Sequence, residues 1–157
     1  MVDADTKDLE NSIRDEAARV IEGDVWVFDV DGCVVDSLTG TSLRPGAREL
    51  HEQLRAKGRV VVWWSAAGNH YARQRAAQFD LVHLVDHFRG KDERGTDGRF
   101  LTDHLPADAA ACVFVDDRPE DLPTGARAVV VSPYLAANPH DTGLERALTA
   151  ATSPTPG

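Results

Sequence analysis

Three apolar runs in this chain each end abruptly in a polar side chain. Asp29, Ser65 and Asp116 follow directly on short runs made mainly of valine and aromatic residues. Continuous apolar runs of this length are typical of buried strands. The strands predicted in this way cover residues 25–30, 60–64, 81–85, 111–115 and 127–131.

Helical patterns alternate with these strands. Pro45 lies where the first turn of a helix tolerates proline, and Gly58 is typical of a helix end. The predicted helices cover residues 5–21 (within an N-terminal segment 1–22), 45–57, 69–79 and 142–151. The alternation predicts an α/β fold, a Rossmann-like doubly wound sheet of about five mainly parallel strands with helices on both faces. We expect residues 86–106 to form a polar loop with a small hairpin, and residues 152–157 a disordered tail.

The length and net charge of the chain limit the number of domains and the kinds of partner that we expect. A chain of 157 residues is large enough for one core, so we expect residues 1–151 to form a single domain. The 26 acidic against 17 basic residues give a net charge of −9, which disfavours membranes and extensive contact with nucleic acid. A local positive pocket for a phosphorylated substrate is compatible with that balance. Cys33 and Cys112 are expected to be free buried thiols, and the acidic N-terminus is no signal peptide, so we predict a cytoplasmic protein.

The polar residues that end the strands are expected to meet at one edge of the sheet. Ligands of parallel sheets bind outside the carboxyl ends of the strands. Asp29 and Asp31 follow one apolar run, and Asp116 and Asp117 follow another. An unpaired buried carboxylate is costly, and a divalent cation together with a phosphate group would explain why the acids are there.

These residue types can carry out phosphoryl transfer. A carboxylate, here Asp29, can attack phosphorus, and Mg²⁺ held with Asp116 would reduce the repulsion between two anions. Asp31 could protonate the leaving oxygen and later deprotonate the attacking water. Ser65 and a nearby cation would bind the phosphoryl oxygens. Gly32 would let the backbone turn tightly beside the phosphate.

The motifs resemble those of the haloacid dehalogenase-like phosphohydrolase superfamily. The run Asp29-Val30-Asp31-Gly32-Cys33-Val34-Val35-Asp36 resembles its first motif, and Val115-Asp116-Asp117-Arg118-Pro119-Glu120-Asp121 resembles its acidic fourth. Ser65 is similar to the second motif and Lys91 to the third. The resemblance covers roughly residues 24–132 and implies a Mg²⁺-dependent phosphatase, with the backbone carbonyl of Asp31 as a further metal ligand. It also implies phosphate esters as substrates, because dehalogenases of the superfamily usually lack the second aspartate.

Two positions in the site have alternatives. Either Asp117 or Asp121 would supply a second carboxylate beside Asp116. The site cation would be Lys91 or Arg89, which lie in the same predicted loop.

Cap domains, which many members of the superfamily insert around the first and second motifs, do not fit in this chain. Neither gap is long enough for a unit with its own core, so we expect a capless protein with an open site. Residues 37–44 are the expected flap over that site. Capless members tend to act on macromolecules or to borrow a lid from another subunit, so a homo-oligomer is compatible with this prediction, and small substrates are too.

The resulting hypothesis is a phosphatase that hydrolyses a phosphate monoester of unknown identity through a phospho-aspartate on Asp29. A non-catalytic or phospho-accepting regulatory domain is the first alternative, but Asp31 favours turnover. A phosphatase of nucleic-acid ends is the second. The acidic balance counts against extensive backbone contacts, whereas contact with a terminal phosphate alone would fit.

Overall fold

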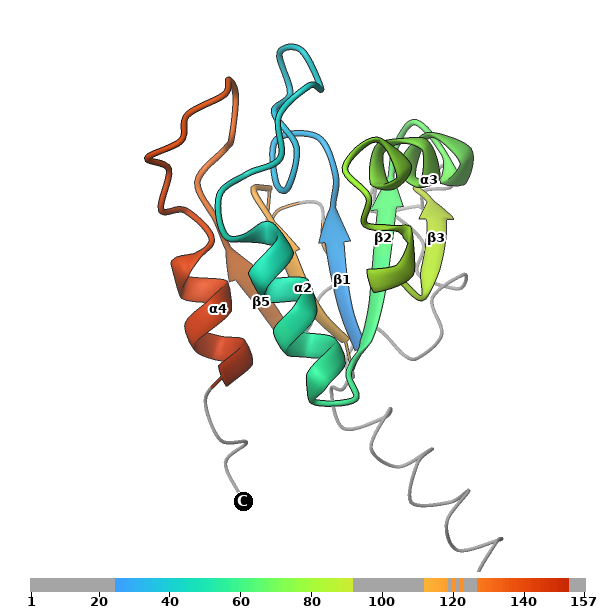
Figure 1. Cartoon of the computed structure of the whole chain (residues 1–157), viewed down its shortest axis with the longest axis vertical. Coiled ribbons are helices and arrows are strands. Elements are labelled where there is room, and N and C mark those ends of the chain that lie inside the picture. Colours follow the sequence, from blue (N-terminus) through green and yellow to red (C-terminus); the bar gives the residue numbers. More distant parts are fainter. Residues whose placement is uncertain (1–24, 92–111, 119, 121, 123–126, 153–157) are drawn as a thin grey trace, which may run out of the picture.

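The computed structural model describes residues 25–91, 112–118, 120, 122 and 127–152. Its five strands form one parallel sheet in the order β3-β2-β1-β4-β5 (Figure 1). The strands are β1 (Val25–Asp29), β2 (Val60–Ser65), β3 (His87–Gly90), β4 (Cys112–Asp116) and β5 (Arg127–Val130). The predicted parallel α/β sheet is confirmed, and its strand order reverses between β1 and β4.

The register of the strands brings their polar ends to one edge. Phe28 of β1 pairs with Val115 of β4, so Asp29 and Asp116 follow one residue on in neighbouring strands. Ser65 ends β2 on the other side of β1. In parallel sheets, the reversal of strand order leaves a crevice at this edge, where ligands bind.

Side chains on the two faces of the sheet belong to two separate apolar clusters. Trp63 is buried in one cluster and Trp64 in the other, because successive side chains of a strand alternate. The described helices all contribute to the Trp63 cluster: α2 (Ala47–Ala56), α3 (Asn69–Gln78) and α4 (Glu145–Thr152). The predicted helix over 5–21 lies outside the described residues, and the described helices leave the prediction of helices on the second face untested.

Helix α2 shows how the sequence produces this packing. Leu50, His51 and Leu54 lie on one face at helical spacing and are fully buried. Trp63 donates a 2.7 Å hydrogen bond to Nε2 of His51, so Nδ1 carries the proton and donates to the carbonyl of Ala47 at 2.7 Å. Burial lowers the pKa of His51 to about 4, and the ring is therefore a neutral core group.

The predicted strand over 81–85 is wrong. These residues form a single 3₁₀ turn, η1 (Val82–Leu84), and the edge strand β3 follows at His87–Gly90. Leu81 and Leu84 are buried in the Trp63 cluster. A short apolar run fills a core from a turn as well as from a strand, and periodicity does not separate the two. The polar composition of β3 is compatible with its position at an edge.

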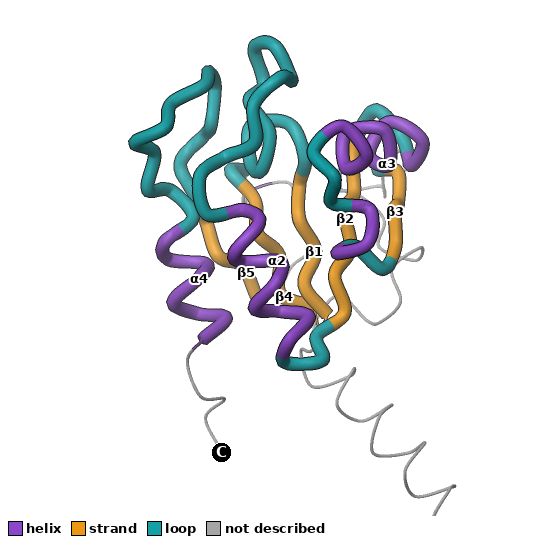
Figure 2. The backbone as a smooth tube through the Cα atoms, viewed as in Figure 1, coloured by secondary structure: helices purple, strands orange, loops and turns teal. Residues whose placement is uncertain are grey.

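Two loops, residues 30–46 and 131–144, lie side by side beyond the carboxyl ends of the strands (Figure 2). The backbone amides of Ser37 and Leu38 donate to the carbonyls of Tyr134 and Leu135 at 3.1 and 2.9 Å. The amide of Tyr134 donates in turn to the carbonyl of Gly32 at 2.7 Å. These bonds fasten the expected flap to the segment after β5, directly above the polar strand ends.

The chain between the first and third motifs holds no cap domain. Every residue from Asp36 to Lys91 is described, and this stretch contains the flap, α2, β2, α3, η1, β3 and the short segments that join them. The capless prediction is therefore confirmed. None of the described helices is long and apolar enough to cross a membrane. Cys33 and Cys112 are buried thiols, as predicted.

Candidate active site

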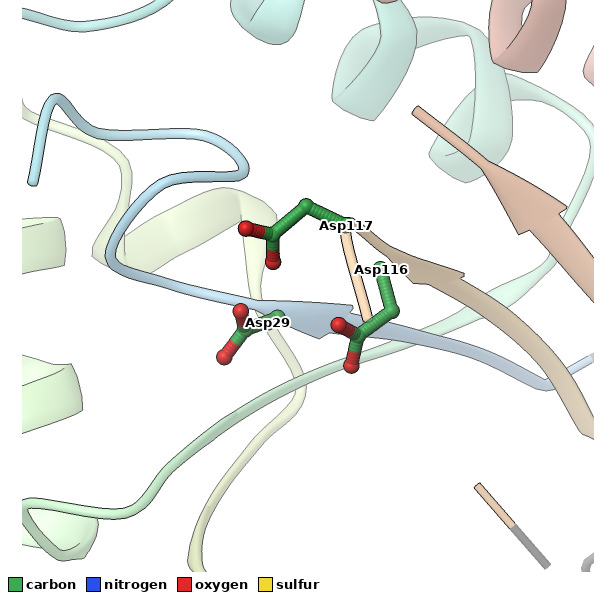
Figure 3. A group of neighbouring side chains, drawn as sticks. All are labelled: Asp29, Asp116 and Asp117. Atoms are coloured by element: carbon green, nitrogen blue, oxygen red, sulfur yellow. The ribbon is translucent and has the colours of Figure 1, made fainter. Parts of the chain in front are cut away.

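Three carboxylates gather at the switch point of the sheet. Asp29 ends β1, Asp116 ends β4, and Asp117 follows it. One oxygen from each lies within 4.8 Å of the other two, and the side chains approach one another in Figure 3. The structure thus brings together the acids that the sequence places after two separate strands. Asp121, the alternative to Asp117, falls outside the described residues.

Lys91 is the cation at these carboxylates. Its backbone amide continues the β2–β3 pairing by donating to the carbonyl of Ser65 at 2.8 Å. Its Nζ lies 2.9 Å from Oδ1 of Asp29 and 3.6 Å from Oδ2 of Asp116. Burial lowers the pKa of Lys91, but the two carboxylates outweigh that effect and raise it, so the amine stays charged. Arg89, the other candidate, donates instead to a backbone oxygen of its own strand.

The carboxylates carry more negative charge than Lys91 can balance. Burial and the nearby Asp29 together raise the pKa of Asp116 to about 7, and Lys91 only partly opposes them. Burial also raises the pKa of Asp29. Oδ1 of Asp116 accepts a 2.8 Å hydrogen bond from the amide of Arg118, whereas Oδ2 is buried and receives none from any described residue.

This donor set fits a divalent cation. Mg²⁺ prefers carboxylate and carbonyl oxygens, and an orphaned buried carboxylate oxygen is the kind of group that a cation would satisfy. A bound cation would also remove the repulsion that raises the pKa of Asp116. The acidic cluster could therefore form a metal site.

The side chain of Asp31 lies outside this cluster. Its Oδ1 accepts a 2.7 Å hydrogen bond from the hydroxyl of Tyr71 on α3. Nε of Arg75, one helical turn further on, donates to the same hydroxyl at 3.0 Å. Sequence reasoning missed both residues. Their spacing of four positions on one helix face is the only local signal, and many surface pairs share it.

Ser65 and Gly32 border the same edge. Ser65 is buried, and its Oγ accepts a 3.1 Å hydrogen bond from the amide of Ala67 in the turn that leads to α3. Gly32 has a φ of +80°, and a Cβ there would lie 3.2 Å from a carboxylate oxygen of Asp117. Glycine is therefore favoured at this position for two reasons: the backbone is left-handed, and a side chain would crowd Asp117.

Asp36, the last acid of the first motif, organises the loop above the site. The carboxylate is fully buried and accepts hydrogen bonds of 2.6–3.2 Å from four backbone amides and two hydroxyls. These donors belong to Thr39, Gly40, Thr41 and Ser42. Burial raises the pKa of Asp36, but the hydrogen bonds from Thr39 and Ser42 outweigh it and hold the pKa far below the usual range. Asp36 belongs to the first motif, but its role could not be predicted from the sequence.

Arg44 is a second structural residue that the sequence analysis missed. The side chain is buried and pairs with Asp141, with Nε 2.6 Å from Oδ1. It also donates to the carbonyl of Cys33 at 3.1 Å and to the hydroxyl of Ser132 at 3.0 Å. A Cβ on Gly143 would overlap the guanidinium. Arg44 thereby ties the first motif to the segment after β5.

Comparisons with known proteins agree with this geometry. The family model described as NLI interacting factor-like phosphatase matches residues 15–153. A solved crystal structure that is 16% identical has a TM-score of 0.50, covering 83% of this chain and 81% of that one, and supports the fold alone. No curated protein matches the chain. The match over most of the chain shows that this protein belongs to the NLI interacting factor-like phosphatases, phosphoric monoester hydrolases of the haloacid dehalogenase-like superfamily that lack a cap domain.

Proposed function

We propose that this chain hydrolyses a phosphate monoester through a phospho-aspartate on Asp29, with Asp31 as general acid and base. The proposal rests mainly on the residues that surround the carboxylate of Asp29. Its carboxylate lies at the switch point of the sheet, 2.9 Å from Lys91 and beside Asp116 and Asp117. Family membership supplies the reaction class, a phosphatase acting on a phosphorylated substrate.

The residues that would hold Mg²⁺ are Asp29, Asp116 and Asp117, together with the backbone carbonyl of Asp31. The side-chain oxygens of the first three form the cluster within 4.8 Å. Bound there, Mg²⁺ would screen the charge between the attacking carboxylate and the phosphoryl group.

The chemistry of the chain's own residues then follows in two steps. An oxygen of Asp29 attacks phosphorus, the bond from phosphorus to the ester oxygen breaks, and Asp31 donates a proton to that oxygen. In the second step Asp31 takes a proton from water, which attacks the phospho-aspartate and releases phosphate and the free carboxylate. Lys91 offsets negative charge on the phosphoryl oxygens, and Ser65 offers them a hydroxyl donor.

The test is hydrolysis of p-nitrophenyl phosphate by the native chain and by Asp29→Asn, each with Mg²⁺ and with EDTA. We expect turnover that requires Mg²⁺ and falls by at least about a thousandfold in the variant, because the amide is a far weaker nucleophile. Asp80→Asn is the matched control. Asp80 is exposed with a φ of +57°, which asparagine tolerates, and this variant should retain the native rate.

A folded native chain with no Mg²⁺-dependent turnover would contradict the proposal and favour the regulatory alternative. Native activity retained in Asp29→Asn would contradict the assignment of the nucleophile. The salt dependence of activity on a 5′- or 3′-phosphorylated oligonucleotide tests the nucleic-acid alternative, since several backbone contacts would make it steep.

A further inference from the structure

A one-way chain of hydrogen bonds ends on Asp31. The guanidinium of Arg75 has donors only, so at the 3.0 Å contact with Tyr71 the phenol oxygen must accept. The phenol proton is then directed to Oδ1 of Asp31, 2.7 Å away. The guanidinium also lies over the phenol ring, 4.9 Å from its centroid, and both side chains are fixed relative to each other.

Only one oxygen of Asp31 is engaged in this way. Among the residues that the structure describes, no donor reaches Oδ2, which stays available for proton transfer. A carboxyl group held by one oxygen presents the other in a defined orientation, which general acid catalysis requires.

The same arginine reaches the flap. Nη1 of Arg75 donates to the carbonyl of Gly40 at 3.2 Å, and Nε2 of Gln78 donates to the same carbonyl at 3.0 Å. Gly40 has a φ of +67°, and a Cβ there would lie 2.6 Å from Arg75. Helix α3 thus contacts both the flap and, through Tyr71, the first motif.

We propose that Tyr71 and Arg75 are positioning residues that hold Oδ1 of Asp31 so that Oδ2 delivers the proton to the leaving oxygen, and that Arg75 couples this arrangement to the flap. This inference rests on the proposed function. When the bond from phosphorus to the ester oxygen breaks, its electron pair goes to that oxygen, which takes the proton from Oδ2. In the hydrolytic step a proton of the attacking water returns to Oδ2. Tyr71 keeps its own proton throughout.

The test compares kcat/KM for p-nitrophenyl phosphate and phenyl phosphate in the native chain and in Tyr71→Phe. Phenolate is the poorer leaving group and depends more on the acid, and kcat/KM reports the step in which it departs. We expect Tyr71→Phe to lose about tenfold with phenyl phosphate and no more than about twofold with p-nitrophenyl phosphate. In the Asp31→Asn background the same change should cost nothing further, because the acid that it positions is gone.

Three variants separate this role from a structural one. Tyr134→Phe removes the other tyrosine hydroxyl, which accepts a 2.9 Å hydrogen bond from the amide of Asn138, and should affect both substrates equally or not at all. Arg75→Gln should repeat the selective loss at about threefold. Gln78→Ala removes a donor to the Gly40 carbonyl and an acceptor 2.9 Å from Nη1 of Arg75, but it leaves the contacts of Arg75 with Tyr71 and of Tyr71 with Asp31 in place. This variant should therefore not discriminate between the substrates.

The outcomes are distinguishable. Equal losses on both substrates in Tyr71→Phe, or an additive loss on top of Asp31→Asn, would overturn the inference while the phosphatase proposal stands. A native chain without Mg²⁺-dependent turnover would overturn both. If Tyr71→Phe fails to fold by circular dichroism, the Arg75→Gln result decides by the same criterion.

Discussion

Asp36 and Asp116 are both buried carboxylates near the edge of one sheet, yet their surroundings are opposite. Six donors within residues 39–42 surround Asp36 and hold its pKa far below the usual range. Asp116 has one backbone donor, to Oδ1, while Oδ2 accepts no hydrogen bond from the described residues and lies 3.6 Å from Nζ of Lys91; its pKa is raised to about 7. The loop therefore stabilises the charged form of Asp36 with its own hydrogen bonds. At the end of β4, the described residues leave the negative charge around Asp116 only partly balanced.

The difference separates a carboxylate that the fold itself satisfies from a carboxylate that a bound ligand could satisfy. A buried carboxylate whose lone pairs are all engaged stabilises the fold and has nothing left to bind. A buried carboxylate with an oxygen that accepts no hydrogen bond destabilises the fold unless a ligand supplies the missing contact.

Asp36→Ala should give the largest loss of stability. Four backbone amides in the loop would lose their acceptor, and we expect the free energy of unfolding to fall by about 3–5 kcal/mol. Urea denaturation followed by circular dichroism measures this loss. Thr39→Val provides a graded comparison, because it removes one hydroxyl donor 2.6 Å from Asp36 and should cost about 1 kcal/mol. A loss below 1 kcal/mol in Asp36→Ala would break the comparison.

Mg²⁺ should stabilise the native chain through Asp116. At a hundred times its dissociation constant a ligand adds about 3 kcal/mol to the free energy of unfolding. Asp116→Asn should lose this gain, while Asp36→Asn, although less stable, should keep it. Thermal melts with Mg²⁺ and with EDTA measure both. Equal stabilisation of the native chain and Asp116→Asn would show that the cation binds elsewhere.

The pH dependence of stability without Mg²⁺ should have opposite signs for the two acids. The pKa of Asp116 rises from 3.8 in the unfolded chain to about 7 in the fold, so the folded state holds the extra proton between these values. The native chain should therefore lose stability relative to Asp116→Asn as the pH rises from 4 to 7, by on the order of 2 kcal/mol.

Asp36 should behave in the reverse sense. Its pKa is lowered in the fold, so its contribution is present above pH 4 and is lost as the pH falls further. The stability difference between the native chain and Asp36→Asn should shrink below pH 4. Two differences of the same sign would contradict the contrast between the acids.

The sequence could predict the polar ends of the central strands because the cue is local. Asp29, Ser65 and Asp116 each interrupt an apolar run, and parallel strands with helical crossovers leave one edge where such residues meet. The prediction of the third strand was wrong for a related reason. The apolar residues of 81–85 fill the core from a turn, while the polar strand β3 lies at the edge, where burial does not select for apolar side chains.

Periodicity and segment length were enough to predict the fold class, the acidic strand ends and the absence of a cap. The contact of Lys91, rather than Arg89, with Asp29 and the hydrogen bond from Tyr71 to Asp31 became evident in the folded chain. These contacts join residues far apart in the chain, and they depend on strand register and on where α3 docks. A shift of one residue in register would turn each side chain to the other face, and the pairing that sets the register joins strands far apart in the chain.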